Sequence, residues 1–216
     1  MTKGILAATA AVVLSQFAGS AQAGVLWDNG GPAVSNVGGS GMSDTIQAED
    51  FQLFGSNILS SITFWNLQSA PADYLGSINW QILKDAGGSP GALVDFGTAT
   101  PTRTAAGTML GLDVFQNSFN LSTLLLGGNY WLTLHNGPVS STGFTDFYWT
   151  WTDLNGTNTG TNRGQELGLD PPASGYTTND QEHAFVVSGD NVPEPGTIAF
   201  AFLGIASFTV RRWYKR

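Results

Sequence analysis

Residues 153–158 form an oxygen-rich, turn-prone run that resembles a calcium-binding loop in composition. Carboxylate and amide oxygens, such as those of Asp153 and Asn155, are ligands that calcium prefers. The run lacks the carboxylate count and the twelfth-position glutamate of an EF-hand. We therefore expect a surface loop and no cofactor, with a structural calcium ion as the alternative. If the fold gathers them, further ligands would come from Asp28, Asn29, Asp180 and Glu182.

Aromatic side chains between residues 148 and 151 could bind sugar rings. In a strand, Trp149 and Trp151 share one face and Tyr148 lies on the other. If one set stays exposed, its rings form a platform on which the flat apolar faces of sugars stack. Burial in a core between two sheets explains the tryptophan pair as well and is favoured, which leaves Tyr148 as the available ring.

The remaining chemistry-bearing residues do not predict an enzyme. Residues 87–91 match the Gly-x-Ser-x-Gly nucleophile elbow, but Pro90 has no N–H to donate to an oxyanion, so a plain β-turn is expected. His135 and His183 lack metal-ligand spacing and are expected to be structural or solvent-facing. The sequence contains no cysteine, which excludes thiol chemistry.

The acidic residues are expected to be solvated surface charges. Glu49 and Asp50 point to opposite faces if their segment is a strand, which is a poor arrangement for a two-carboxylate glycosidase. Between residues 24 and 192, three basic residues stand against fifteen acidic ones, a net charge of about −12. Such a surface repels nucleic acid and anionic membranes, so cations and neutral glycans are the plausible partners.

The elements that would position these groups are short β-strands. Apolar and polar residues alternate in segments such as 78–82 and 147–151, and glycine, asparagine, serine and proline separate the segments. We predict an all-β fold, an antiparallel, jelly-roll-like β-sandwich, with a long connection at 153–180. The predicted strands are 25–27, 46–53, 59–66, 78–84, 93–98, 112–119, 130–135, 145–152 and 184–188.

The N-terminal end of the chain reads as a secretory signal. Lys3 provides a basic start, and residues 5–17 form a short apolar stretch. Small residues follow at both recognition positions, Ala21 and Ala23. We predict an N-terminal signal helix that signal peptidase removes, so that the mature chain begins at Gly24.

The C-terminal end combines an extended motif, an apolar stretch and a basic stop. The motif consists of Val192, Pro193, Glu194, Pro195 and Gly196. Residues 197–210 carry no charge and predict a short transmembrane helix, below the roughly 20 residues of a comfortable span. The cations that follow predict a cytoplasmic C-terminus and an external body. These cations are Arg211, Arg212, Lys215 and Arg216.

This combination resembles the PEP-CTERM sorting tail over residues 192–216. In that family an inner-membrane exosortase recognises the tail and removes it near the Pro-Glu-Pro motif, in Gram-negative bacteria that often make extracellular polysaccharide. The resemblance implies transient inner-membrane anchoring, followed by a place at the cell surface or in the extracellular matrix of a biofilm. The tail is also catalogued as an ice-binding-protein C-terminal domain, but a sorting signal does not imply what its cargo binds.

Two features of the body are similar to those of PEP-CTERM cargo proteins. These are the Pro-Gly turn within residues 87–91 and the Gly-x-x-Tyr-Trp-Leu pattern that ends at Leu132. This second resemblance implies a sandwich body without an assigned activity, and it carries no functional residues to transfer.

We therefore expect three parts: a signal peptide at 1–23, a β-sandwich domain at 24–190 and a sorting tail at 191–216. The expected function is that of an exported, non-enzymatic structural or interaction protein. Its processing partners would be signal peptidase and an exosortase-type membrane protease. The alternative is a glycan-binding module, with or without calcium, that associates with extracellular polysaccharide.

Overall fold

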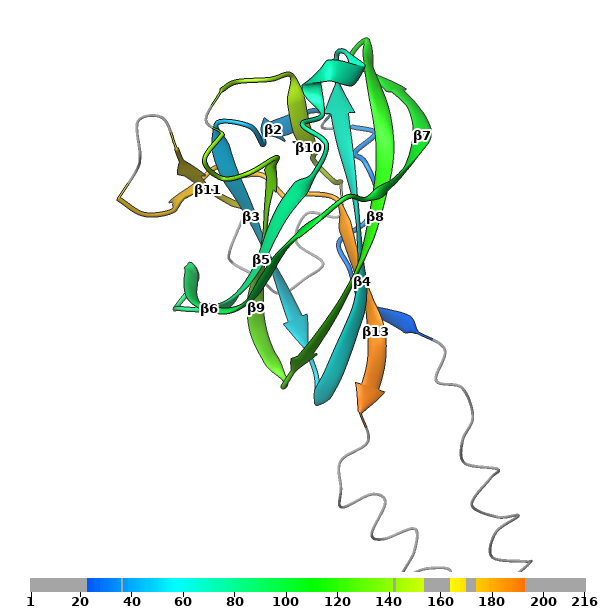
Figure 1. Cartoon of the computed structure of the whole chain (residues 1–216). Helices are drawn as coiled ribbons and strands as arrows, with labels where there is room; N and C mark the ends of the chain where they lie inside the picture. The colour runs from blue at the N-terminus through cyan, green and yellow to red at the C-terminus, as the bar shows by residue number, and fades with distance from the viewer. Residues whose placement is uncertain (1–22, 36, 142, 154–163, 170–173, 193–216) are drawn as a thin grey trace, which may run out of the picture.

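The computed structural model describes residues 23–35, 37–141, 143–153, 164–169 and 174–192, and over these ranges the chain is all-β (Figure 1). Every predicted strand is present, with its ends shifted by a few residues. Within the described ranges no helix has the length and apolar character needed to cross a bilayer. The predicted signal helix and C-terminal span fall outside these ranges.

One antiparallel sheet, called sheet A here, is organised around the long strand β4 (Ser56–Gln68). Its strand order is β1 (Gly24–Asp28), β13 (Phe185–Val192), β4, β10 (Phe147–Thr150) and β2 (Gly39–Gly41). On its other side β4 pairs with β8 (Leu112–Leu125), and β8 pairs in turn with β7 (Thr102–Met109).

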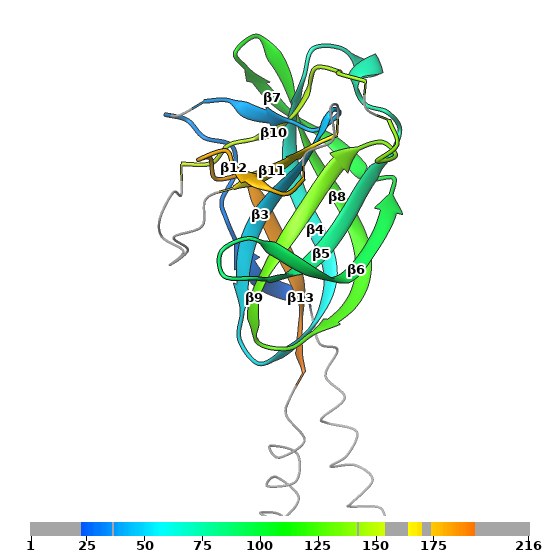
Figure 2. The ribbon, with the colours of Figure 1, turned by 90° about the vertical axis from the view of Figure 1, so that its left-hand side faces the viewer.

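The second antiparallel sheet, sheet B, lies nearer the viewer in Figure 2. Its strand order is β12 (Thr177–Thr178), β11 (Gln165–Gly168), β3 (Thr45–Leu53), β9 (Gly128–Asn136), β5 (Ile78–Asp85) and β6 (Pro90–Ala99). A 3₁₀ turn, η1 (Pro71–Asp73), lies on the connection from β4 to β5. The two sheets are consistent with the predicted sandwich.

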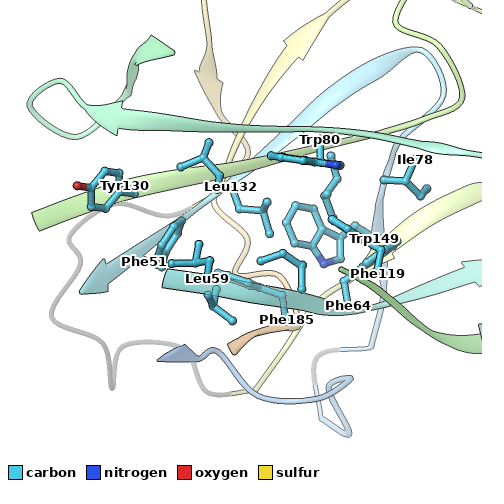
Figure 3. Packing of buried hydrophobic residues seen from close by; sticks show 14 of the residues in the cluster. Phe51, Leu59, Phe64, Ile78, Trp80, Phe119, Tyr130, Leu132, Trp149 and Phe185 are labelled. Carbon is cyan, nitrogen blue, oxygen red and sulfur yellow. The ribbon is translucent and has the colours of Figure 1, made fainter. Parts of the chain in front are cut away.

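The core between the sheets follows the alternation of the strands (Figure 3). Phe51 and Leu132 of sheet B meet Leu59, Phe64 and Phe185 of sheet A, and all five side chains are buried. Aromatic rings pack edge to face across this layer, as in the Phe51–Phe185 pair with 6.3 Å between ring centroids. Burial of this apolar surface is the main stabilising contribution, because the chain has no disulfide.

Several strands were not predicted because their residues carry little β signal. β2 is Gly-Ser-Gly, and β7 is rich in exposed threonine and alanine. β11 and β12 lie within residues 153–180, where a long connection was predicted; that prediction was wrong for these two short segments. Each of these segments is a strand because its backbone pairs with a neighbouring strand, and such pairing leaves no pattern in the side chains.

Both boundaries of the predicted body lie at the same end of sheet A. β1 starts at Gly24, which pairs with Gly189 of β13, and β13 ends at Val192, which pairs with Ser56 (Figure 1). Gly189 is needed there, because a Cβ at this position would lie 2.2 Å from the Ile58 carbonyl oxygen. The points at which the chain enters and leaves the folded body therefore lie side by side.

Candidate functional site

The strand β3 brings a carboxyl group into the space between the sheets. Glu49 follows the inward alternation of Phe51 and Leu53, and its exposed fraction is 0%. β11 pairs with β3 only as far as Ala48, and the side chain of Glu49 meets a further segment. That segment is the one leading into β13, and it contains His183.

Glu49 and His183 form a buried pair. The Oε2 atom of Glu49 accepts a hydrogen bond from the backbone N–H of His183 at 2.8 Å and lies 2.7 Å from His183 Nδ1. The imidazole is also 0% exposed and packs on Trp149, with 4.8 Å between ring centroids. His183 is thus a buried, structural ring, which is one of the two roles predicted for it. The prediction that Glu49 is a solvated surface acid was wrong.

Ser40 of β2 completes a chain of polar contacts. Its Oγ atom lies 2.9 Å from His183 Nε2 and accepts a hydrogen bond from the Trp151 indole N–H at 3.0 Å. With the ring proton on Nδ1, the serine hydroxyl donates to Nε2. Nδ1–H then donates to Glu49.

The order Ser40, His183, Glu49 is that of a hydrolase triad, but two features argue against Ser40 as a nucleophile. Besides the Trp151 indole, the Asn179 amide nitrogen lies 3.5 Å from Ser40 Oγ, so donors surround its lone pairs. Burial lowers the pKa of His183 to about 3, which makes the ring a weak base near neutral pH. We interpret the chain of contacts as a polar network that joins the two sheets.

Three carboxyl groups gather beside this network, and we call Glu49, Asp50 and Glu182 the acid cluster. One oxygen of each lies within 4.8 Å of the others. Burial, and then the charges of Glu182 and Asp50, raise the pKa of Glu49 well above its ordinary value of 4.5. Burial, and then Glu182, raise the pKa of Asp50 from 3.8 to about 7. The Asn29 amide nitrogen lies 3.4 Å from Glu182 Oε2.

The acid cluster has the donor set of a hard-cation site. Two oxygens bound to one calcium ion at about 2.4 Å can be at most about 4.8 Å apart, and the three carboxyl groups meet that condition. A cation would also favour the ionised forms that burial and mutual repulsion disfavour. Sequence reasoning included Glu182 among the extra ligands but missed Glu49 and Asp50, because the strand pattern places those two on opposite faces.

Of the predicted calcium loop, residues 153–158, the structure describes only Asp153. The Asp153 carboxylate accepts hydrogen bonds from the backbone N–H of Val34 at 2.6 Å and from the backbone N–H and hydroxyl of Ser35. Asp153 therefore fastens the loop before β2. Asn155 lies outside the described residues. Asp28 accepts from the N–H of Gly30, which is a local turn contact.

The predicted sugar platform is largely inside the protein. Trp149 is 0% exposed and donates its indole N–H to the Ala184 carbonyl at 2.9 Å, so its ring cannot stack on a sugar. Trp151 is half-buried and engaged with Ser40. Tyr148, also half-buried, donates its hydroxyl to Asp146 at 2.8 Å. The core interpretation is confirmed for Trp149, and the platform hypothesis was wrong for it.

The other residues considered for chemistry have structural roles. Residues 87–91 include the turn between β5 and β6, in which the Asp85 carboxylate accepts from the N–H groups of Gly87 and Gly88. His135 is buried, with its ring nitrogens 3.0 and 3.1 Å from the carbonyl oxygens of Gly137 and Ser43. These contacts confirm the predicted turn and a structural histidine.

A hydroxyl-lined cleft of about 570 Å³ lies where the chain passes from β6 to β7. Three threonines and a serine give it hydrogen-bonding groups, whereas the one aromatic residue in its wall, Phe119, is buried. The lining residues are Thr98, Ala99, Thr100, Thr102, Ser118, Phe119 and Asn120. The cleft therefore lacks an exposed aromatic ring on which a sugar could stack.

The predicted processing sites border the folded body. Ala23 is exposed, and Gly24 is the first residue of β1. Val192 is the last residue of β13. Ala21, the motif residues Pro193 to Gly196 and the four basic residues of the stop lie outside the described residues.

No family model matches this chain, and no curated protein matches it.

Proposed function

We propose that this chain is an exported surface or matrix protein, sorted by a PEP-CTERM-type tail, whose jelly-roll-like sandwich acts as a structural or interaction module and not as an enzyme. The observation that carries the proposal is the position of the two predicted processing sites. Both adjoin paired strands at one end of the body, β1 at Gly24 and β13 at Val192.

Cleavage at either site would leave the fold intact. Signal peptidase cutting after Ala23 would release Gly24 as the first residue of β1 without removing a strand residue. An exosortase-type protease acting between Pro193 and Pro195 would cut just beyond β13, where the prolines favour an extended chain. Processing enzymes need extended, accessible segments, and these positions can supply them.

The tail residues would hold the chain at the membrane until this second cut. The uncharged stretch 197–210 would form a short helix in the bilayer, and the basic residues after it would stay in the cytoplasm. Its short length makes the anchor weaker than an ordinary transmembrane helix. Release then requires a single cleavage outside the membrane.

The test is intact-mass analysis of the protein from the medium and the membranes of its host, with and without the exosortase-type protease. We expect a soluble species that begins at Gly24 and ends near Pro193 to Pro195, and it should disappear without the protease. A Pro193→Ala/Pro195→Ala variant should remain in the membrane fraction with Arg216 retained. A variant with alanine at Pro138, which lies in the body, is the matched control. Identical full-length protein in both strains would contradict the proposal.

The acid cluster favours a second candidate function, that of a calcium-assisted glycan-binding module. Its three carboxyl oxygens lie within 4.8 Å and would bind one calcium ion, whose open coordination sites could accept sugar hydroxyls. The test is retardation of the protein on extracellular polysaccharide of its host, with calcium and after chelation. Retardation that chelation abolishes supports this function, and equal mobility in both conditions contradicts it.

A further inference from the structure

Large apolar side chains are exposed at the end of the body where the chain leaves it. Phe54 is 76% exposed, Leu126 65%, Leu124 62% and Ile58 40%. We call these four residues the apolar tip. Exposed apolar residues are ordinary when scattered singly, but a group at one end of a domain calls for an explanation.

The four residues come together because two turns meet. Phe54 lies in the turn from β3 to β4, and Leu126 lies in the turn from β8 to β9. The turns touch, since a Cβ at Gly127 would lie 3.0 Å from the Gly55 backbone nitrogen. Ile58 and Leu124 are direct partners in the pairing of β4 with β8, so they share the outer face of sheet A.

Buried polar side chains hold both turns in place. The amide of Asn57, 1% exposed, donates to the carbonyl oxygens of Phe54 at 3.0 Å and Gly55 at 3.1 Å. The Tyr130 hydroxyl donates to the Leu126 carbonyl at 2.9 Å. The backbone of the apolar tip is thus fixed while its side chains face outward, which lowers the entropic cost of contacting another surface.

The tail begins beside the apolar tip. Val192 pairs with Ser56, which lies between Phe54 and Ile58 in the sequence. Four residues, Pro193 to Gly196, separate Val192 from the uncharged stretch 197–210. Fully extended, this connection spans at most about 18 Å, so an anchored tail would keep the apolar tip close to the bilayer surface.

We propose that the apolar tip is a membrane-contact surface that seats the body on the lipid bilayer while the tail is still attached. This inference rests on the proposed anchoring of the tail. The contact has to be apolar, because a body with a net charge of about −12 gains nothing from anionic headgroups. An aromatic and three aliphatic side chains on two adjoining turns suit insertion into the interfacial layer.

Seating would orient the protein for processing. With the apolar tip on the membrane, the segment after Val192 lies at the bilayer surface, where a membrane protease acts. The opposite end of the body would face away from the membrane. After cleavage the tail no longer holds the body at the bilayer, and four apolar side chains alone would form a weak, reversible contact that permits release.

The experiment uses the chain from Gly24 to Arg216, which keeps the tail and lacks the predicted signal peptide, in zwitterionic phosphatidylcholine vesicles. The sequence has no cysteine, so one introduced cysteine can carry an environment-sensitive fluorophore. The tip label is placed at Leu124→Cys. The control label is placed at Phe144→Cys, which has the same 62% exposure and lies in the loop after β9, at the opposite end. We expect a blue shift and quenching by bromolipids for the tip label but not for the control.

Flotation separates failure of this inference from failure of tail anchoring. Protein that floats with the vesicles while the tip label behaves like the control label overturns the apolar tip as a contact surface but leaves anchoring intact. Protein that does not float overturns both. A blue shift without vesicles that grows with protein concentration shows contact between copies and also overturns the inference.

A double variant tests the side chains themselves. Phe54→Ser/Leu126→Ser should still float, because the tail is unchanged, but the tip label should lose most of its blue shift and quenching. Both side chains are exposed, so the variant should keep the melting temperature of the parent. Replacing the exposed Val34 and Phe144 by serine provides the matched control and should leave the signal unchanged. An undiminished signal in the tip variant contradicts the proposal.

Discussion

The imidazole of His183 lies 2.7 Å from the carboxyl group of Glu49, and neither side chain has exposed surface. Burial acts on the two groups in opposite directions, because it disfavours the charged form of each. It raises the pKa of Glu49 well above 4.5 and lowers that of His183 to about 3. At pH values between the pKa of His183 and the raised pKa of Glu49, both side chains are therefore uncharged.

The first prediction is that the free energy of unfolding decreases from pH 5 to pH 7 in calcium-free buffer. Above their ordinary values of 4.5 and 3.8, Glu49 and Asp50 hold protons in the folded state that the unfolded chain has lost, so stability falls as pH rises. His183 acts oppositely, but only between pH 3 and 6.5. The net loss is about 1.4 kcal/mol per pH unit for each excess proton. Urea titrations across this range measure it.

Glu49→Gln isolates the contribution of the buried carboxyl group. The amide keeps the size of the side chain and a carbonyl acceptor for His183 but does not titrate. We expect the decline toward pH 7 to flatten by up to about 1.4 kcal/mol per pH unit. Asp190→Asn, outside the acid cluster, should leave the slope unchanged. A Glu49→Gln variant with the slope of the parent would show that Glu49 does not carry the effect.

The second prediction is that calcium raises stability at pH 8. Binding to the acid cluster would stabilise the ionised carboxylates in the folded state, and a site of extracellular affinity at about 10 mM calcium contributes about 1.5–3 kcal/mol. Differential scanning fluorimetry with calcium and with EDTA measures this effect. Asp50→Asn should abolish the calcium response, whereas Asp113→Asn should retain it. Equal melting temperatures with calcium and EDTA would contradict a cation site.

The third prediction concerns the tryptophan once considered for a sugar platform. Trp149→Ala should lower the free energy of unfolding by about 3–5 kcal/mol, because it empties a fully buried ring site and leaves the Ala184 carbonyl without its donor. Tyr148→Ala, on the other face of the same strand, should cost much less because the ring is half-buried. Denaturant titrations followed by circular dichroism compare the two. Equal losses would place Trp149 outside the core.

The fourth prediction tests the close approach of β13 to β4. Gly189→Ala would place a Cβ 2.2 Å from the Ile58 carbonyl oxygen and 2.9 Å from the Leu59 Cα, so the backbone would have to move. We expect a loss of about 1–3 kcal/mol. Gly31→Ala, where nothing lies within 4 Å, is the control and should be close to neutral. Melting temperatures of the two variants compare these losses, and equal values would contradict the close approach.

Sequence reasoning located the strands more reliably than the site. The alternation around Trp80 and Ile82 predicted β5, and the polar run at 87–91 predicted the turn after it, because side-chain period and turn chemistry are local properties. β2 was missed, since Gly-Ser-Gly has no such period and exists as a strand only through pairing with β10. Ser40 was therefore never a candidate for a polar network.

The amino-acid sequence by itself determined the all-β class, the alternation that fills the core and the acidic charge of the body, because each depends on residue types and their spacing. Only the tertiary structure decided that Glu49 is buried against His183, that Glu182 joins it, and that Leu124 pairs with Ile58 of β4, the strand that also pairs with the one leading into the tail. These relationships join residues more than 60 positions apart. Local patterns carry no information about such contacts, which arise from the order and register in which the strands pair.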